Sequence, residues 1–85
     1  MMFNISAHAR REMLRRGIPE AWVRDIMENP GQIVPVRGEK KAYQSLRDLK
    51  GKKYLVRVIV ADDKDPCVVV TVYLTSKIAK YWRPT

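Results

Sequence analysis

The sequence has little of what metal and cofactor sites are built from. It contains one cysteine, Cys67, and one histidine, His8, in 85 residues. A lone cysteine excludes an intramolecular disulfide, which is typical of proteins from a reducing compartment. One cysteine and one histidine also provide no zinc-ligand spacing. Glycine-rich phosphate loops and dinucleotide-binding fingerprints are missing as well. We therefore expect neither a metal ion nor a cofactor.

Long apolar runs are missing too. No run reaches the roughly 18 residues that a membrane-spanning helix needs, and the N-terminus lacks the apolar segment of a signal peptide. We expect a soluble, cytoplasmic protein without membrane contact. Hydrophobic residues still make up 46% of the chain, which is typical of globular rather than disordered chains. The length predicts a single domain, residues 1–85, with a thin core.

Acidic residues are few compared with basic ones. Seventeen Lys and Arg face nine Asp and Glu, which gives a net charge of +8. This excess favours a polyanionic partner, nucleic acid first, although the same field would attract an acidic protein. Three acidic residues cluster at Asp62, Asp63 and Asp65. The Gly and Glu that complete a calcium loop do not follow them, so this segment is predicted to be a solvated turn.

The hydrophobic periodicity predicts two helices and then strands. Ser6 is a good N-cap and Gly17 a good terminator for a first helix over residues 6–16. A second helix starts near Pro19 and ends before Asn29-Pro30. Strands are predicted over residues 33–36, 41–47, 53–61 and 67–74, with a last turn at 76–82. The order predicts an α+β fold: an N-terminal helical hairpin packed on one face of a three- or four-stranded antiparallel sheet, with a short C-terminal helix.

Residues 67–74 form the strongest predicted strand, and we expect it to be the central one. Because side chains alternate along a strand, Thr71 and Tyr73 point away from the core. The same alternation predicts that the core receives Val68, Val70, Val72 and Leu74. Threonine and tyrosine are also ordinary strand residues, so their position does not by itself define a site.

His8 lies on a cationic face of the first helix. At about 100° per residue it shares one arc with Arg11, Glu12, Arg15 and Arg16. One imidazole, many cations and several phenols suit RNA cleavage without a metal. That reaction needs a base for the ribose 2′-OH, positive charge at the phosphate and an acid for the leaving 5′-oxygen. Imidazole titrates close to neutral pH and suits either proton transfer.

The chain also resembles a small bacterial domain family of unknown function. The likeness spans nearly the whole chain and rests on short motifs: His8-Ala9, Met13, Arg16-Gly17-Ile18, Asn29-Pro30, the run from Val70 to Tyr73, and a tail with Thr75-Ser76-Lys77-Ile78 and Tyr81-Trp82. This family is similar to the RelE and BrnT toxins, which share a helix-helix-sheet fold with other ribonucleases. The resemblance implies an mRNA-cleaving toxin of a type II toxin–antitoxin pair. It also implies that an acidic antitoxin would bind the basic cleft and inhibit the toxin.

One position departs from the family pattern. The family usually carries an arginine just before the methionine, and here that position is Glu12. Either Arg11 substitutes for the missing arginine, or Glu12 is itself the base, or catalysis is weakened or lost. The alternative function is therefore a non-catalytic, basic module that binds nucleic acid or protein.

Together these arguments predict an endoribonuclease that acts on single-stranded RNA. The predicted catalytic residues are His8 for proton transfer, Arg16 and Lys77 for the phosphate charge, and Tyr73 at the site. Residues predicted to bind RNA are Arg11, Arg15, Thr71, Lys80 and Tyr81.

Overall fold

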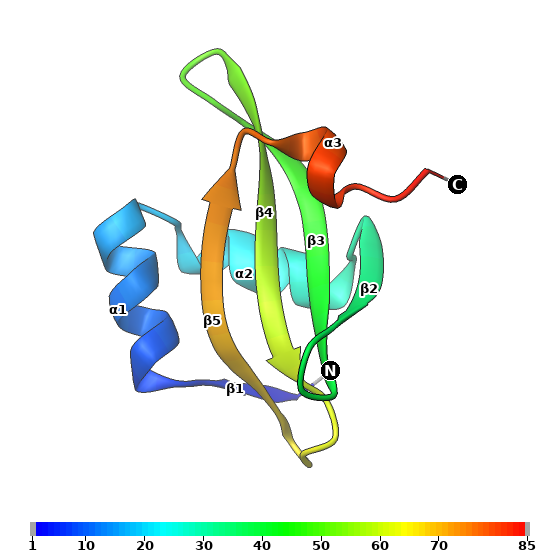
Figure 1. Cartoon of the computed structure of the whole chain (residues 1–85). Helices are drawn as coiled ribbons and strands as arrows, with labels where there is room; N and C mark the ends of the chain where they lie inside the picture. The colour runs from blue at the N-terminus through cyan, green and yellow to red at the C-terminus, as the bar shows by residue number, and fades with distance from the viewer. Residues whose placement is uncertain (1, 85) are drawn as a thin grey trace.

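The computed structural model describes residues 2–84 as one mixed sheet of five strands with three short helices (Figure 1). The strands are β1 (Phe3–Ile5), β2 (Gln32–Val36), β3 (Lys40–Leu49), β4 (Lys52–Ala61) and β5 (Cys67–Thr75). The helices are α1 (Ala7–Arg16), α2 (Glu20–Glu28) and α3 (Ile78–Tyr81). The strand order is β1-β5-β4-β3-β2. β1 pairs with β5 in parallel, and the other neighbours are antiparallel.

The predicted architecture, a helical hairpin on one face of a three- or four-stranded antiparallel sheet, is wrong. The sheet has five strands and is mixed, because β1 precedes the first helix and runs parallel to β5. The central strand is β4 rather than β5. α2 crosses one face of the sheet, whereas α1 stands beside β5 at the edge (Figure 1). A strand of three residues shows no alternation that a sequence pattern could reveal, and its partner lies some 60 residues away.

A β-bulge in β5 changes which side chains enter the core. The register pairs Ile59 with Thr71 but Val60 with Val69, so Val70 has no partner on β4. An extra residue of this kind reverses the facing of everything beyond it. As a result Val69 and Val72 are both fully buried.

The prediction of which β5 side chains face the core is therefore correct after the bulge and wrong before it. Val72 is a core residue and Leu74 packs against the core, as expected. Val68 and Val70 do not belong to the core, and Val69 takes their place, with Cys67 packed beside it. Simple alternation cannot predict this, because nothing in a run of valines marks the bulge.

Ser6 fastens α1 to the bulge. Its backbone N–H donates to the Val69 carbonyl at 3.0 Å, and its hydroxyl donates to the Val70 carbonyl at 3.0 Å. The same hydroxyl accepts from the Ala9 N–H at 3.0 Å, which makes Ser6 the N-cap of α1 as predicted. One side chain thus satisfies the unpaired carbonyl of the bulge and an orphan donor of the helix.

The apolar core lies between the sheet and the two longer helices. α2 contributes Val23, Ile26 and Met27, and α1 contributes Ala9 and Met13. Buried residues of β4 that face them are Val56, Val58 and Val60. Within residues 2–84, none of the helices is both long and apolar enough to cross a membrane.

Adjacent valines in β5 provide a test of the bulge. We expect Val69→Asp to abolish cooperative folding, because an unpaired buried carboxylate costs several kcal/mol against a total stability of about 5–15 kcal/mol. Val68→Asp should remain folded with a lower Tm, because Val68 is only half-buried and outside the core. Thermal unfolding followed by circular dichroism distinguishes the two variants. Equal damage from both, or greater damage from Val68→Asp, would contradict the register.

Candidate functional site

A row of polar side chains crosses the sheet face opposite α2. The register pairs Gln32 with Gln44, Gln44 with Arg57, and Arg57 with Tyr73, so these four residues are direct neighbours across β2, β3, β4 and β5. Partners in register share one face of a sheet. Tyr43 is the neighbour of Gln44 along β3 and belongs to the helix-covered core, so these four residues face the other way. We call them the polar row.

Hydrogen bonds join the members of the polar row. The Arg57 Nε donates to Gln44 Oε1 at 2.8 Å, and Arg57 Nη1 donates to the Tyr73 hydroxyl at 2.5 Å. Gln44 Nε2 donates to Gln32 Oε1 at 3.0 Å. The guanidinium is therefore held in one orientation from both sides.

The C-terminal segment covers the polar row. α3 lies on the face opposite α2 (Figure 1), and the Tyr81 ring centroid is 4.3 Å from the Arg57 guanidinium carbon. This stacking is a cation–π contact. The rings of Tyr73 and Tyr81 also meet edge to face at 6.5 Å. Under this cover Arg57 is 6% exposed and Gln44 is fully buried.

Two glutamines and a glycine hold the C-terminal segment in place. Gln44 Nε2 donates to the Tyr81 carbonyl at 3.1 Å. Gln32 Oε1 accepts from the Arg83 N–H at 3.0 Å, while Gln32 Nε2 donates to the Arg83 carbonyl at 2.5 Å. A Cβ at Gly31 would lie 3.0 Å from the Trp82 ring, so glycine lets the indole come close. These contacts dock the C-terminal segment, α3 included, on the sheet.

Within residues 2–84, the charge of Arg57 has no carboxylate partner. Among residues 2–84, every ion pair involves other residues. The partners of Arg57 are a neutral amide, a neutral phenol and an aromatic ring. Burying a charge without a counter-ion is costly, and a planar guanidinium is the side chain best suited to binding phosphate. The arrangement therefore favours an anionic ligand.

Arg57 orients the Tyr73 hydroxyl. Its oxygen accepts from Arg57 Nη1, so the phenolic O–H is directed elsewhere. A phenol oriented by a cation in this way can donate its proton to an anionic ligand beside that cation. Within the part of the chain that the structure describes, no three His, Cys, Asp or Glu side chains are grouped for a metal ion.

The predicted site residues fall into two groups, and the first group lies on β5 and on the C-terminal segment that follows it. Tyr73 and Tyr81 meet there, and Thr71 follows the same face of β5 two residues away. The Lys80 Nζ lies 5.3 Å from the Tyr81 ring centroid. Lys77 precedes α3, where its N–H donates to the Thr75 hydroxyl at 3.1 Å. α3 itself has Lys77 as its N-cap, without a side-chain capping hydrogen bond.

The second group lies on α1. The exposed residues of this group are His8, Arg11, Arg15 and Arg16. No hydrogen bond or ion pair of residues 2–84 connects them to Tyr73 or Tyr81. α1 does contact β5, the strand that carries Tyr73, so the two groups belong to adjacent elements.

Glu12 neutralises part of the cationic face of α1. Its carboxylate accepts from Arg15 Nη2 at 2.8 Å and from Arg16 Nε at 3.2 Å. These bonds, that to Arg15 first, lower the pKa of Glu12 to about 2. A carboxylate of such low basicity is a poor general base near neutral pH. Of the three readings of Glu12, the geometry disfavours the one that makes it the base.

Sequence reasoning missed the two residues at the centre of the site, Arg57 and Gln44. A signal was present, because Arg57 interrupts an otherwise apolar run over residues 55–60. Arginine is rarely buried unless it is paired, so its place in a core strand could have marked it. Gln44 had no comparable signal, because it stands in a stretch of mixed polar and apolar residues and its partner Arg57 lies on another strand.

The Glu12 ion pairs give a pH-dependent contribution to stability. The folded-state pKa of about 2 lies below the usual 4.5, so the contribution is complete above pH 4.5 and disappears as the pH falls toward 2. We expect the difference in unfolding free energy between the wild type and Glu12→Gln to be constant from pH 5 to 7 and to shrink below pH 4.5. Urea unfolding at a series of pH values measures it, with Glu28→Gln as the control for loss of an exposed carboxylate. A difference that grows as the pH falls would contradict the ion pairs.

Comparison with known proteins identifies one domain family. No curated protein and no solved structure matches the chain. Nothing in the comparisons links it to RelE or BrnT, so that kinship stays a prediction. One domain-family model, described as a domain of unknown function, matches residues 5–74. The matched range includes Gln44, Arg57 and Tyr73 but ends before α3. The chain belongs to the DUF4258 family.

Proposed function

We propose that the protein is a metal-independent endoribonuclease that binds single-stranded RNA at the polar row, with the C-terminal segment that covers Arg57 displaced. The observation that supports this most is the environment of Arg57. Its guanidinium is buried, its hydrogen-bond partners are neutral, and none of its partners within residues 2–84 is a carboxylate. A phosphodiester would supply the missing negative charge and accept charge-assisted hydrogen bonds. Tyr81 and Tyr73 add aromatic rings on which unpaired bases can stack.

The proposed reaction is attack of the ribose 2′-oxygen on the adjacent phosphorus. The new P–O2′ bond forms as the P–O5′ bond breaks, which yields a 2′,3′-cyclic phosphate and a free 5′-OH. Arg57 stabilises the charge that develops on the phosphoryl oxygens. Tyr73 donates its proton to the leaving 5′-oxygen. His8 on α1 is the proposed base for the 2′-OH, although no hydrogen bond or ion pair of residues 2–84 connects it to Tyr73.

The remaining cations would extend the RNA path. Arg16 and Lys77 add positive charge at the phosphate, and Thr71, Lys80 and Tyr81 line the approach on the sheet side. Arg11 and Arg15 would bind neighbouring phosphates along α1. The net charge of +8 supports such a role, as does the resemblance to RelE- and BrnT-type toxins, which also implies an acidic antitoxin as inhibitor.

A second function, binding without catalysis, is favoured by one specific observation. Glu12 stands where the family usually has an arginine and pairs with both Arg15 and Arg16. This removes positive charge from the ridge next to His8. A binding module would hold RNA with an affinity that falls steeply with salt and would leave the RNA intact.

Cleavage assays test the enzyme proposal. We expect the wild type to cleave single-stranded RNA in EDTA and Tyr73→Phe to lose about 10²–10⁴-fold in rate, the usual loss when a general acid is removed. His8→Ala should lose a comparable factor. Tyr54→Phe removes a phenol from the same sheet outside the polar row and should keep the wild-type rate. Product analysis should find 2′,3′-cyclic phosphate ends.

Growth on induction should accompany this assay, since toxins that act on the ribosome are silent on free RNA. Growth arrest by the wild type but not by Tyr73→Phe would support the proposal. Intact RNA together with unaffected growth would overturn it in favour of the binding module. Cleavage that persists in Tyr73→Phe would reject the assignment of the acid.

Inorganic phosphate tests the anion site separately from catalysis. A ligand that binds only the folded state raises stability, and about 1 kcal/mol raises the Tm of a domain of this size by about 4–8 °C. We expect phosphate to raise the Tm of the wild type and to leave that of Arg57→Gln nearly unchanged. Arg37→Gln, which removes an exposed turn arginine, should respond like the wild type. Equal responses of all three proteins would show that phosphate does not bind at Arg57.

A further inference from the structure

The two glutamines of the polar row bind backbone groups of the C-terminal segment in a fixed order. Gln44 Nε2 donates to the Tyr81 carbonyl at 3.1 Å. Gln32 Oε1 accepts from the Arg83 N–H at 3.0 Å, and Gln32 Nε2 donates to the Arg83 carbonyl at 2.5 Å. From β3 to β2, the segment therefore presents an acceptor, a donor and an acceptor. Displacement of the segment, which the proposed function requires, would leave the glutamine groups free for a ligand with the same pattern.

Arg57 determines which way both amides point. A guanidinium only donates hydrogen bonds, so the Gln44 atom that lies 2.8 Å from Arg57 Nε is the amide oxygen. The Gln44 nitrogen therefore faces Gln32, where it is 3.0 Å from the Gln32 oxygen that accepts from it. Gln32 Nε2 then lies on the far side of that oxygen. Across the two side chains the groups follow the order nitrogen, oxygen, nitrogen, which is donor, acceptor, donor.

The Watson–Crick edge of uracil is complementary to this order. It presents a carbonyl, an N–H and a second carbonyl, which is the pattern that the C-terminal segment presents. Cytosine has one donor followed by two acceptors, guanine has one acceptor followed by two donors, and adenine has only one donor and one acceptor. Each of these three bases would leave at least one of the three glutamine groups without a partner. Such a loss is costly for a buried polar group.

We propose that Gln32 and Gln44 recognise an unpaired uracil, so that the RNA bound at the polar row is read at a uridine. This inference rests on the proposed RNA function and adds the identity of a base to it. Gln32 and Gln44 are register partners on neighbouring strands, which lie about 4.8 Å apart, so one base reaches both amides. Watson–Crick edges are free only in unpaired RNA, in agreement with a single-stranded substrate.

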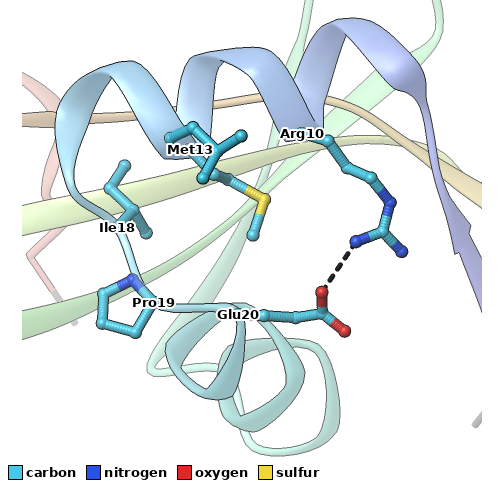
Figure 2. A pocket seen from close by; sticks show the side chains of 6 residues that line it. Arg10, Met13, Ile18, Pro19 and Glu20 are labelled. Atoms are coloured by element: carbon cyan, nitrogen blue, oxygen red, sulfur yellow. Dashed lines mark hydrogen bonds and ion pairs between the residues drawn. The ribbon is translucent and has the colours of Figure 1, made fainter.

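A polypeptide backbone carries the same pattern, as the C-terminal segment itself does, but the charge of Arg57 favours RNA. Within residues 2–84 this charge has no carboxylate partner, and a backbone supplies no anion. Arg10, by contrast, donates to Glu20 at 2.7 Å across the hollow of about 290 Å³ where α1 turns into α2 (Figure 2). An RNA strand brings both a base for the glutamines and a phosphate for Arg57.

Oligonucleotides that differ at one base test the proposal. The probes are 2′-O-methyl heptanucleotides of alternating cytidine and adenosine whose central base is U, C, A or G, and their binding is measured by fluorescence anisotropy. The methyl groups prevent cleavage, so binding is measured apart from catalysis. We expect the wild type to bind the U probe about tenfold more tightly than the other three, as one good two-point base contact provides.

Gln32→Glu should change the preferred base, which loss of a merely structural residue would not do. Both oxygens of the new carboxylate accept, so the order becomes donor, acceptor, acceptor, which is complementary to guanine. We expect this variant to bind the G probe about tenfold more tightly than the U probe. The added negative charge weakens all four probes alike, so the ratio carries the result. Asn4→Asp adds the same charge at an exposed position of β1 and should keep the preference for uracil.

Trp82→Ala tests whether the segment and the base compete. It removes the ring that lies against Gly31 and loosens the segment, so all four probes should bind more tightly by the factor in which the open population rises. Unchanged affinities would overturn the proposal, because segment and base would then not share the glutamines. Tighter binding of a peptide of residues 77–84 than of any probe would assign the glutamines to a polypeptide backbone instead.

The remaining outcomes separate this inference from the proposed function. Equal affinities of the wild type for the four probes, or a Gln32→Glu variant that still prefers uracil, would overturn the reading of uracil and leave RNA binding at Arg57 standing. Failure of the wild type and of Trp82→Ala to bind any probe would overturn the RNA function and this inference with it.

Discussion

Burial of the Arg57 guanidinium without a counter-ion among residues 2–84 is the constraint on which the sheet face opposite α2 depends. The charge is acceptable there only because Gln44 and Tyr73 hold it by hydrogen bonds and Tyr81 stacks upon it. These contacts depend on two features of the fold. The registers of β3, β4 and β5 place Gln44, Arg57 and Tyr73 side by side, and the docked C-terminal segment supplies Tyr81.

The two faces of the sheet differ in polarity. The face toward α1 and α2 is apolar and supplies the core, whereas the opposite face carries the polar row. The division between the two faces depends on the bulge in β5, where the side chains change the face to which they point. Ser6 anchors α1 at this bulge. Without the bulge, the alternation that buries Val69 would send Thr71 and Tyr73 into the core.

The sequence predicted local elements better than their arrangement. The N-cap Ser6 and the terminator Gly17 bounded α1 correctly because capping is a property of neighbouring residues. β1 and the bulge at Val70 escaped prediction because both depend on pairing between distant segments. Tyr73 and Tyr81 were predicted as site residues, whereas Gln44 and Arg57 were not. Arg57 interrupts an apolar run, which could have marked it, but Gln44 carries no such local signal.

The central claim is that Arg57 is where a nucleic-acid phosphate binds. The most direct test is an NMR titration of ¹⁵N-labelled protein with a single-stranded oligonucleotide whose 2′-O-methyl riboses prevent cleavage. The account predicts that the Arg57 Nε–H resonance shifts first, together with the side-chain amide of Gln44 and the backbone of Tyr73. Shifts confined to α1 and α2, with the Arg57 resonance unchanged at saturation, would contradict it.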